Sequence, residues 1–321
     1  MSTKVSILIP VYKSEKYIEK CLVSVFSQTY SNIEYIIVDD ASPDKSMEIA
    51  YRIVDRYPQR KTSVHIIKNE RNFGIAYTRN ILLNNSTGDY IYFVDSDDFI
   101  DLQAIEIFVT IAKEKNSDIV RCNYYSFNNG GAVAVTRKPI TDNYDYIRDC
   151  LNDETMNSLR LLFIRKRIIN DYCLIFPQDI NGCEDLLMTI KLFYHANIIT
   201  ETHHPLYYYR QDNDDSITHD ERTFKKNFCL AVKEILSFLK DNKIYENYKT
   251  EILRLMFVSK QNFLLSKDIR DIDKYVNTFP ESNSIYKTLN YNRKEKTLFY
   301  LAEHNHTFIL KIAIKLLTLL L

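Results

Sequence analysis

The sequence predicts an α/β fold in which a mostly parallel sheet is flanked by helices and followed by a C-terminal helical region. Apolar, strand-like runs alternate with helix-length amphipathic runs through the first third of the chain, which is typical of β-α-β units. The strand-like runs are almost continuously apolar, as expected for a sheet covered on both faces. Beyond Thr218 the period becomes helical, and Phe224, Phe228, Val232 and Ile235 fall on one stripe.

The elements of the first third can be bounded from the pattern. The predicted strands are Val5–Val11, Ile33–Asp40, Val64–Lys68, Tyr90–Val94 and Ser117–Cys122. The predicted helices are Ile18–Val25, Asp44–Tyr57, Ile75–Leu83 and Leu102–Lys115. Ser14 is placed to cap the first of these helices, because a serine oxygen can accept a hydrogen bond from a free amide of the first turn.

The alternation of predicted strands and helices ends near Asn128. An NNGG turn there begins a stretch of shorter, less regular elements that continues to Ile217. We therefore expect one domain over residues 1–217, divided near residue 120, and a helical region over residues 218–321.

Composition narrows the function classes. Lysine plus arginine and aspartate plus glutamate are balanced at 42 each, so no overall positive field favours nucleic acid as a partner. The six cysteines form no CxxC pair, which favours reduced thiols in the cytoplasm over disulfides or a zinc site. The first apolar run is too short for a signal peptide, and no window has the length of a membrane span. We therefore expect a cytoplasmic globular protein.

Polar residues stand at the ends of three predicted strands. They are Pro10–Tyr12, Asp39–Ser42 and Asp95–Asp98. Because ligands of parallel sheets bind at the carboxyl ends of the strands, these three segments are expected to line one crevice.

The acidic cluster is the sharpest signal. Asp95, Asp97 and Asp98 place three like charges within four residues at the end of a buried strand. They would repel one another unless a cation lay between them or they pointed into water. A one-residue gap puts Asp95 and Asp97 on the same side of an extended segment, and Mg²⁺ or Mn²⁺ prefers carboxylate oxygens. The alternative is a solvated acidic turn that starts the next helix.

Four motifs in order carry a family resemblance. They are VSILIPVYKSEKYIEKCLVSVFSQTYSNIEYIIVDDASPD, NFGIAYTRN, GDYIYFVDSDD and GCEDLLM. Together they cover roughly the first two thirds of the chain, which resembles a family 2 glycosyltransferase with the GT-A fold, of the bacterial cell-surface glycan type. The resemblance implies inverting transfer of a sugar from a nucleoside diphosphate to a hydroxyl. It makes residues 1–120 the nucleotide-binding half and residues 121–217 the acceptor half.

The resemblance assigns roles to the acidic motif. It makes Asp97 the direct ligand of a Mn²⁺ or Mg²⁺ ion and places Asp95 by the ribose and the metal, with Ser96 between them in the DxD-type motif. Such a cation would stabilise the departing diphosphate as a Lewis acid. Asp98 is expected to accept hydrogen bonds from nearby backbone amides instead.

The resemblance also assigns residues to the binding of the nucleotide. Asp40 resembles the residue that hydrogen-bonds the nucleobase edge, and a carboxylate can accept from the N3–H of uracil, which favours a UDP-sugar. Pro10, Val11 and Tyr12 would supply backbone contacts and a ring against the base. Arg79 would grip the diphosphate. The alternatives are turn capping for Asp40 and a surface salt bridge for Arg79.

The resemblance makes Asp185, in GCEDLLM, the base that takes the proton from the acceptor hydroxyl. The alternative is ordinary acidity in the first turn of a helix. Glu184 would orient a hydroxyl, Arg210 would meet the diphosphate and His219 would approach the metal, but the sequence leaves these three roles open.

The pattern favours single-sugar addition to a glycan or lipid-linked acceptor, because the QxxRW motif and the membrane helices of processive synthases are missing from this sequence. The alternatives are a catalytically silent binding protein of the same fold or, more weakly, a sugar nucleotidyltransferase, whose glycine-rich loop is replaced here by PVYKSEKY. Residues 307–321, with Lys311 and Lys315 on one face, suit either a helix at the inner face of the cell membrane or a helix packed on protein.

Overall fold

The computed structural model divides the chain into two compact units, Met1–Cys150 with Thr155–His219, and Leu151–Glu154 with Asp220–Leu321. The residues that the structure describes are 2–137, 139–140, 142–152, 158–213, 221–266, 268–304 and 306–319. The boundary expected near residue 217 lies outside these described residues.

The first unit is built around a nine-stranded sheet of order β3-β2-β1-β4-β8-β6-β9-β5, with β7 paired to β6. Its strands are β1 (Val5–Val11), β2 (Ile33–Asp39), β3 (Val64–Lys68), β4 (Tyr90–Phe93), β5 (Phe99–Ile100), β6 (Ile119–Asn128), β7 (Gly131–Val135), β8 (Leu162–Arg165) and β9 (Ile199–Arg210). The helices of this part of the chain are α1 (Ile18–Phe26), α2 (Ser46–Arg56), α3 (Pro58–Lys61), α4 (Ile75–Asn85), α5 (Ala104–Lys115), α6 (Asn143–Asn152), the 3-10 turn η1 (Leu159–Leu161), α7 (Lys166–Asp171) and α8 (Glu184–His195).

The sheet has a parallel half and a mixed half. Strands β3, β2, β1 and β4 pair in parallel, as the alternating sequence pattern predicts. Strand β8 is antiparallel to both of its neighbours, β4 and β6, while β9 runs parallel to β6 and antiparallel to β5. Because β8 runs against β4, the residues that precede β8 lie beside the residues that follow β4.

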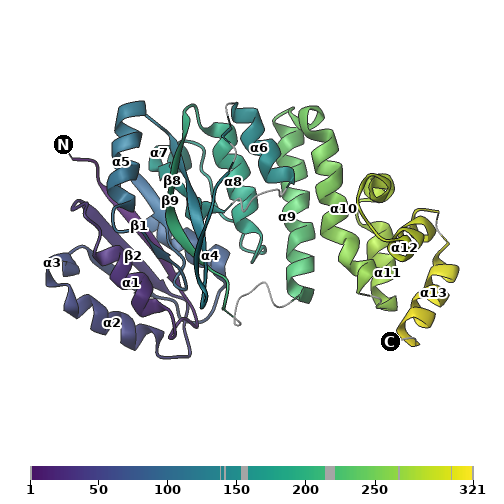
Figure 1. Ribbon diagram of the computed structural model, residues 1–321, viewed down its shortest axis with the longest axis horizontal. Coiled ribbons are helices and arrows are strands. Elements are labelled where there is room, and N and C mark those ends of the chain that lie inside the picture. The colour runs from purple at the N-terminus through teal and green to yellow at the C-terminus, as the bar shows by residue number, and fades with distance from the viewer. Residues whose placement is uncertain are drawn as a thin grey trace. The chain divides into compact units, whose positions relative to one another are not determined.

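Side chains alternate between the two faces of the sheet along each strand, and helices cover both faces. Val5, Ile7 and Ile9 on β1 belong to one hydrophobic cluster with buried residues of α1, α2 and α5. Helix α4 also contacts β1 and β2. In Figure 1, α1, α2 and α5 lie on one side of the sheet and α4 and α8 on the other. Both faces of β1 and β2 are therefore buried, which is why their sequences are almost uniformly apolar.

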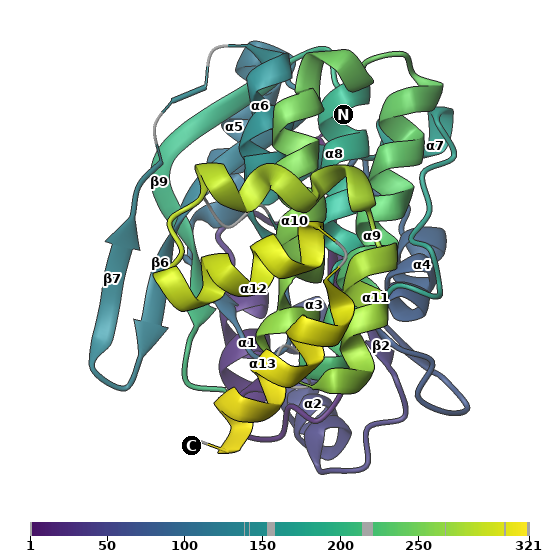
Figure 2. The same ribbon diagram turned by 90° about the vertical axis from the view of Figure 1, so that its right-hand side faces the viewer.

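The irregular sequence near Asn128 forms a β-hairpin. Strands β6 and β7 pair antiparallel up to Asn128 and Gly131, and Gly131 has a φ of 120°, which favours glycine. Figure 2 shows this hairpin at the edge of the sheet.

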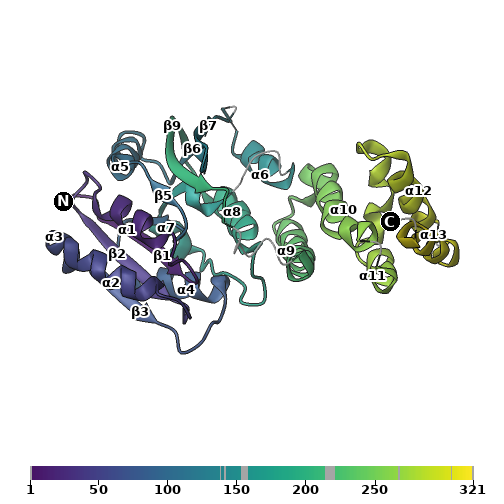
Figure 3. The same cartoon turned by 60° about the horizontal axis from the view of Figure 1, so that its bottom comes forward.

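The second unit is helical. Its elements are α9 (Glu221–Asp241), η3 (Tyr245–Tyr248), α10 (Lys249–Leu265), η4 (Ile269–Asp271), α11 (Ile272–Asn277), η5 (Pro280–Thr288), α12 (Arg293–Glu303) and α13 (Thr307–Leu319). Val232 and Ile235 of the predicted stripe are fully buried. Helix α9 packs against α10, and the two helices lie side by side in both Figure 1 and Figure 3. None of the helices that the structure describes combines the length and the apolar character needed to cross a bilayer.

Helix α13 packs within the helical unit through one face. Leu310 and Ile314 are fully buried in a cluster with residues of α10 and α12, so this face is packed on protein. Phe308, Ile309 and Ile312 remain exposed, Phe308 by 76%. The helix therefore has a second, apolar face that its own unit does not cover.

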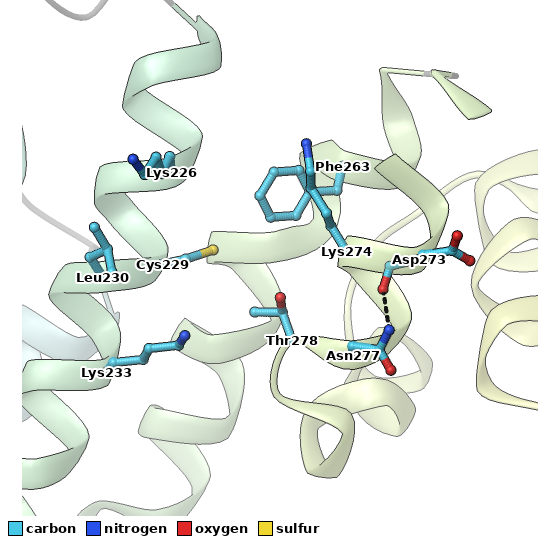
Figure 4. A pocket seen from close by; sticks show the side chains of 9 residues that line it. All are labelled: Lys226, Cys229, Leu230, Lys233, Phe263, Asp273, Lys274, Asn277 and Thr278. Atoms are coloured by element: carbon cyan, nitrogen blue, oxygen red, sulfur yellow. Dashed lines mark hydrogen bonds between the residues drawn. The ribbon is translucent and has the colours of Figure 1, made fainter. Parts of the chain in front are cut away.

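A hollow of about 430 Å³ opens among α9, α10 and α11. Figure 4 shows its lining, to which α9 contributes Lys226, Cys229 and Lys233. All of the lining residues belong to the second unit.

Lys260, on α10, is a fully buried cation. Its ammonium group donates to the carbonyl oxygens of Thr278 and Phe279, at 2.7 and 2.9 Å, and to the side chain of Asn283. Burial lowers the pKa of Lys260 to about 8, although the charge of Glu281 acts in the opposite direction. The contacts fix the turn at Phe279, whose φ of 45° is left-handed.

We expect the stability of the native protein to rise between about pH 8 and about pH 9.5 relative to a Lys260→Met variant. In this window the unfolded lysine, with a pKa near 10.4, still holds a proton that the folded lysine has released, so raising the pH favours the folded state by on the order of 1–2 kcal/mol. Urea unfolding at both pH values measures the difference. Lys249→Met, which removes an exposed lysine of the same helix, should keep the native pH dependence. A native stability that falls relative to Lys260→Met across this window contradicts the assignment.

Candidate active site

Strands β2 and β3 lie on one side of β1 and β4 lies on the other, so the order of the strands reverses between β1 and β4. A crevice at the carboxyl ends of the strands is expected at such a switch point. The segments that follow these two strands meet there, because the hydroxyls of Ser14 and Ser96 lie 2.6 Å apart. The prediction that Ser14 caps α1 through its side chain is wrong. Tyr17 is the N-cap residue, without a side-chain cap, and Ser14 bonds the amide of Ile18 through its carbonyl oxygen.

Asp98 is a structural member of the acidic cluster. Its buried carboxylate accepts hydrogen bonds from the Tyr207 hydroxyl at 2.7 Å and, as expected, from a backbone amide, that of Arg210, at 2.8 Å. It also pairs with the Arg160 guanidinium at 3.2 Å. These partners hold the loop after β4 against β9 and leave Asp98 little capacity for a ligand.

Asp95 and Asp97 differ in their partners. Asp95 lies 3.4 Å from both Arg79 and Arg160. Burial opposes the charge, but Arg160 and then Arg79 outweigh it and hold the pKa of Asp95 below its usual value. Asp97 accepts a hydrogen bond from the Asn213 amide at 2.8 Å and has no ion-pair partner among the described residues. Burial, with the charge of Asp95 added, raises the pKa of Asp97.

These two carboxylates fit a divalent cation that shares its coordination with a substrate. The part of the chain that the structure describes contains no group of three or more His, Cys, Asp and Glu residues that could hold a metal ion. Mg²⁺ is commonly bound by one or two carboxylates together with substrate phosphates. Asp97 has the hard oxygen donors that such a cation needs and no ion-pair partner among the described residues, and Asp95 stands two residues before it.

Arg79 projects from α4 and joins two motifs. Its side chain is only 5% exposed and pairs with Glu184 as well as with Asp95. A surface salt bridge is therefore the wrong description of Arg79. The terminal nitrogens of its guanidinium are engaged by carboxylates, so in this structure Arg79 ties the acidic cluster to the start of α8, and its contact with a diphosphate stays a prediction.

The GCEDLLM motif forms the start of α8. Gly182 has a φ of 101°, and its amide donates to Glu184 at 2.5 Å. Glu184 is buried beside Arg79; burial raises the pKa of Glu184, and the Arg79 charge opposes that shift. Asp185 is half-buried, and its Oδ2 accepts a hydrogen bond from the Ser158 hydroxyl at 3.1 Å. Of the two acids, Asp185 is the one available to a substrate.

Asp40 organises a loop at the end of β2. Its Oδ1 accepts from the side-chain amide of Asn69 at 2.8 Å and from the backbone amide of Phe73 at 3.0 Å, and its Oδ2 accepts from the amide of Gly74 at 2.9 Å. The capping alternative thus describes this structure, and one acceptor position remains for the predicted nucleobase contact.

Gly74 allows a close approach between the two sides of the site. Its φ is 90°, and a Cβ atom there would lie 2.4 Å from the side-chain oxygen of Asn181. That oxygen accepts a hydrogen bond from the amide of Ala76 at 3.2 Å. The loop before α8 therefore packs directly on the start of α4.

The remaining predicted residues lie at the end of β1 and in the acidic motif. Pro10 and Val11 are buried in β1, where the Val11 carbonyl accepts from the Asp40 amide at 2.9 Å. Tyr12 follows and is 37% exposed, so its ring is accessible. Ser96 is buried through its contact with Ser14. The structure thus keeps Tyr12 available and leaves Pro10, Val11 and Ser96 to act through the backbone.

Sequence reasoning missed Ser158, Arg160 and Asn213. All three come from the irregular middle third, where the sequence carried no periodic signal, and only the antiparallel placement of β8 brings the first two to the acidic cluster. Arg210, whose role was left open, donates to the Asp97 carbonyl at 2.9 Å. His219 lies outside the described residues.

Fold and site together define an α/β protein of the GT-A class, with an acidic cluster at the switch point of its sheet. The model of Glycosyl transferase family 2 matches residues 6–173, more than half of the chain, and the chain belongs to this family.

Three bacterial proteins illustrate what this chain is similar to. Glycosyltransferase GlyA of Streptococcus pneumoniae is 41% identical over 125 residues, 39% of this chain and 17% of GlyA. A poly(ribitol-phosphate) beta-glucosyltransferase of Bacillus spizizenii is 28% identical over 269 residues, 83% of this chain and 41% of that enzyme. The chain thus spans less than half of the length of either relative. The crystal structure of Staphylococcus aureus TarS 1-349 in complex with UDP-GlcNAc shares the fold, with a TM-score of 0.69 at 20% identity, covering 97% of this chain and 90% of that one.

Proposed function

We propose that this chain is an inverting, metal-dependent glycosyltransferase that transfers a single sugar from a UDP-sugar to a hydroxyl of a cell-surface glycan. The observation that carries the proposal is that the half-buried Asp97, without an ion-pair partner among the described residues, stands two residues after Asp95 at the switch point. Arg79 joins Asp95 to the segment that bears Asp185. Family membership supports the reaction class.

Each residue has a distinct task in this proposal. Asp97 and Asp95 would hold Mn²⁺ or Mg²⁺, which supplies Lewis-acid stabilisation of the diphosphate charge. The acceptor oxygen attacks the anomeric carbon from the face opposite the diphosphate, so the new bond to carbon forms as the bond to the diphosphate breaks, and the configuration inverts. Asp185 takes the proton of the attacking hydroxyl.

The nucleotide and the acceptor are proposed from different observations. TarS is described as binding UDP-GlcNAc and UDP, and Asp40 retains one acceptor position at the end of β2 where uracil would present its N3–H. The Bacillus relative acts on poly(ribitol-phosphate), which makes a ribitol-phosphate oligomer the first acceptor to test. The proposed reaction is thus sugar transfer from UDP to a polyol or sugar hydroxyl.

A peripheral membrane contact through α13 belongs to the same proposal. Phe308, Ile309 and Ile312 are exposed, and Lys311 and Lys315 flank them, a combination suited to an interface of anionic headgroups. Such a contact would place the enzyme at the cytoplasmic face of the membrane, where a lipid-linked acceptor is presented. Co-sedimentation with vesicles of anionic lipid tests it, and equal recovery with and without vesicles contradicts it.

A nucleotide screen followed by a turnover assay tests the proposed function. With Mn²⁺ present, UDP should raise the melting temperature more than GDP does, because stability gains RT ln(1 + [L]/Kd) from a ligand of the folded state. UDP-glucose and UDP-GlcNAc are then incubated with Mn²⁺ and the ribitol-phosphate oligomer, and UDP release above donor hydrolysis is expected. A shift with UDP but no release of UDP identifies the silent binding protein. No shift with UDP and Mn²⁺ overturns the proposal.

A further inference from the structure

We infer that Ser158 and Arg160 form a positioning pair that dedicates one carboxylate oxygen of Asp185 to the protein and leaves the other oxygen for the substrate. The inference rests on the proposed function, because it takes Asp185 as the base. It assigns a task to two residues that the family motifs do not include.

The topology explains why these residues reach the site. Strand β8 pairs antiparallel with β4, from Arg165 opposite Tyr90 to Phe163 opposite Tyr92. The residues before β8 therefore continue past the end of β4, beside the acidic cluster. The turn η1, which leads into β8, also contacts α8. Ser158 and Arg160 thus lie between the acidic cluster and the start of α8.

Arg160 is held by partners on several sides. Its terminal nitrogens lie 3.2 Å from Asp98 and 3.4 Å from Asp95, and its Nε donates to the Ser158 hydroxyl at 2.8 Å. The ring of Tyr209 lies 4.6 Å from the guanidinium carbon. A planar guanidinium presents donors on three nitrogens and so reaches these separated acceptors at once, whereas the three donors of a lysine share one nitrogen.

The chemistry of the donors fixes the direction of the hydrogen bonds. Arginine carries only N–H donors, so the Ser158 oxygen must accept from Arg160. The hydroxyl hydrogen of Ser158 is then free to be donated, and Asp185 Oδ2 lies 3.1 Å away to receive it. A hydroxyl without Arg160 could rotate and accept from another donor, so the arginine sets the orientation of the serine.

The series of contacts that runs from Asp95 through Arg160 and Ser158 to Asp185 has a consequence for the reaction. Oδ2 of Asp185 is an acceptor for Ser158, and its rotation is restricted. The other carboxylate oxygen, Oδ1, remains to receive the proton of the acceptor hydroxyl. The neighbouring charges, Glu184 and Arg79, are paired with each other.

Ser158→Ala removes the donated hydrogen bond without removing a charge. We expect kcat to fall at least about tenfold, because a hydrogen bond to a charged group is lost, while KM for the UDP-sugar and the affinity for UDP with Mn²⁺ by calorimetry stay at native values. Ser158→Thr keeps the hydroxyl and should restore most of the rate. Turnover is followed as UDP release, with the ribitol-phosphate oligomer and with water as acceptors.

Thr189→Val serves as the matched control. Thr189 lies on α8, and its buried hydroxyl oxygen has no hydrogen-bond partner in the described part of the chain. Loss of this hydroxyl should leave kcat unchanged. That result would show that removing a buried hydroxyl from this region does not by itself lower the rate.

The outcomes separate this inference from the proposed function. Native kcat in Ser158→Ala together with an inactive Asp185→Asn overturns the positioning pair alone. Native kcat in Asp185→Asn overturns the base assignment and the pair with it. Loss of UDP binding or a lower melting temperature in Ser158→Ala, without recovery in Ser158→Thr, shows a merely structural role and also overturns the pair.

Discussion

Replacing Asp97 by asparagine is expected to abolish sugar transfer while leaving the fold at least as stable as the native fold. Asparagine keeps the shape of the side chain and an oxygen for the Asn213 amide, but it removes the charge that would hold the cation. Because a cation contributes several kcal/mol to the transition state and each 1.4 kcal/mol is a factor of ten, we expect turnover to fall by about 10³-fold or more. UDP release measures the loss.

The stability readout makes this prediction specific. Burial and the charge of Asp95 raise the pKa of Asp97, so its charge is costly in the folded protein and its removal should not lower the melting temperature. Mn²⁺ should also no longer strengthen UDP binding. The control is Asp101→Asn, at a carboxylate that caps the amide of Gln103 and can be replaced by an amide oxygen. An Asp97→Asn variant that is active with Mn²⁺, or that unfolds, contradicts the role given to Asp97.

Replacing Asp185 by asparagine is expected to lower kcat by about 10²- to 10⁴-fold, the usual contribution of a positioned general base. The amide oxygen can still accept from Ser158, so the start of α8 should keep its structure, and UDP should bind with native affinity. Pre-steady-state and steady-state UDP release measure the loss, and calorimetry measures the binding.

The control for Asp185 is Asp179→Asn, an exposed acid in the loop before α8. It removes the same charge from the same region and should leave kcat unchanged. Loss of UDP binding in Asp185→Asn would place this residue at the donor and not at the acceptor.

The parallel half of the fold could be predicted from the sequence because its signals are local. Uniformly apolar runs such as Val5–Val11 require burial on both faces, and the helices between them are amphipathic. The mixed half could not be predicted, since the direction of β8 depends on which edge of the sheet it joins. Nothing in the sequence Leu162–Arg165 distinguishes a strand that runs with β4 from one that runs against it.

The residues of the candidate site likewise fall into those that could be predicted from the sequence and those that could not. The acids at the end of β4 were found because three charges after a buried strand need an explanation, and their placement in a crevice follows from the sheet. The partners of these acids were not found. Arg160 and Asn213 stand alone in irregular sequence, and their value lies in contacts with residues that are far away along the chain. For Arg79 the predicted helix was correct, but its burial between Asp95 and Glu184 was not foreseen.

The antiparallel strand β8 also bears on how such enzymes could be recombined. It pairs with β4 and brings Arg160 to Asp95 and Asp98, although in sequence it belongs to residues 121–217, the segment that we expect to recognise the acceptor. A chimera that grafts a foreign acceptor segment after residue 120 would leave those acids without their arginine and β4 without its neighbour. A graft that is meant to exchange specificity therefore has to retain η1 and β8 from the parent that supplies residues 1–120.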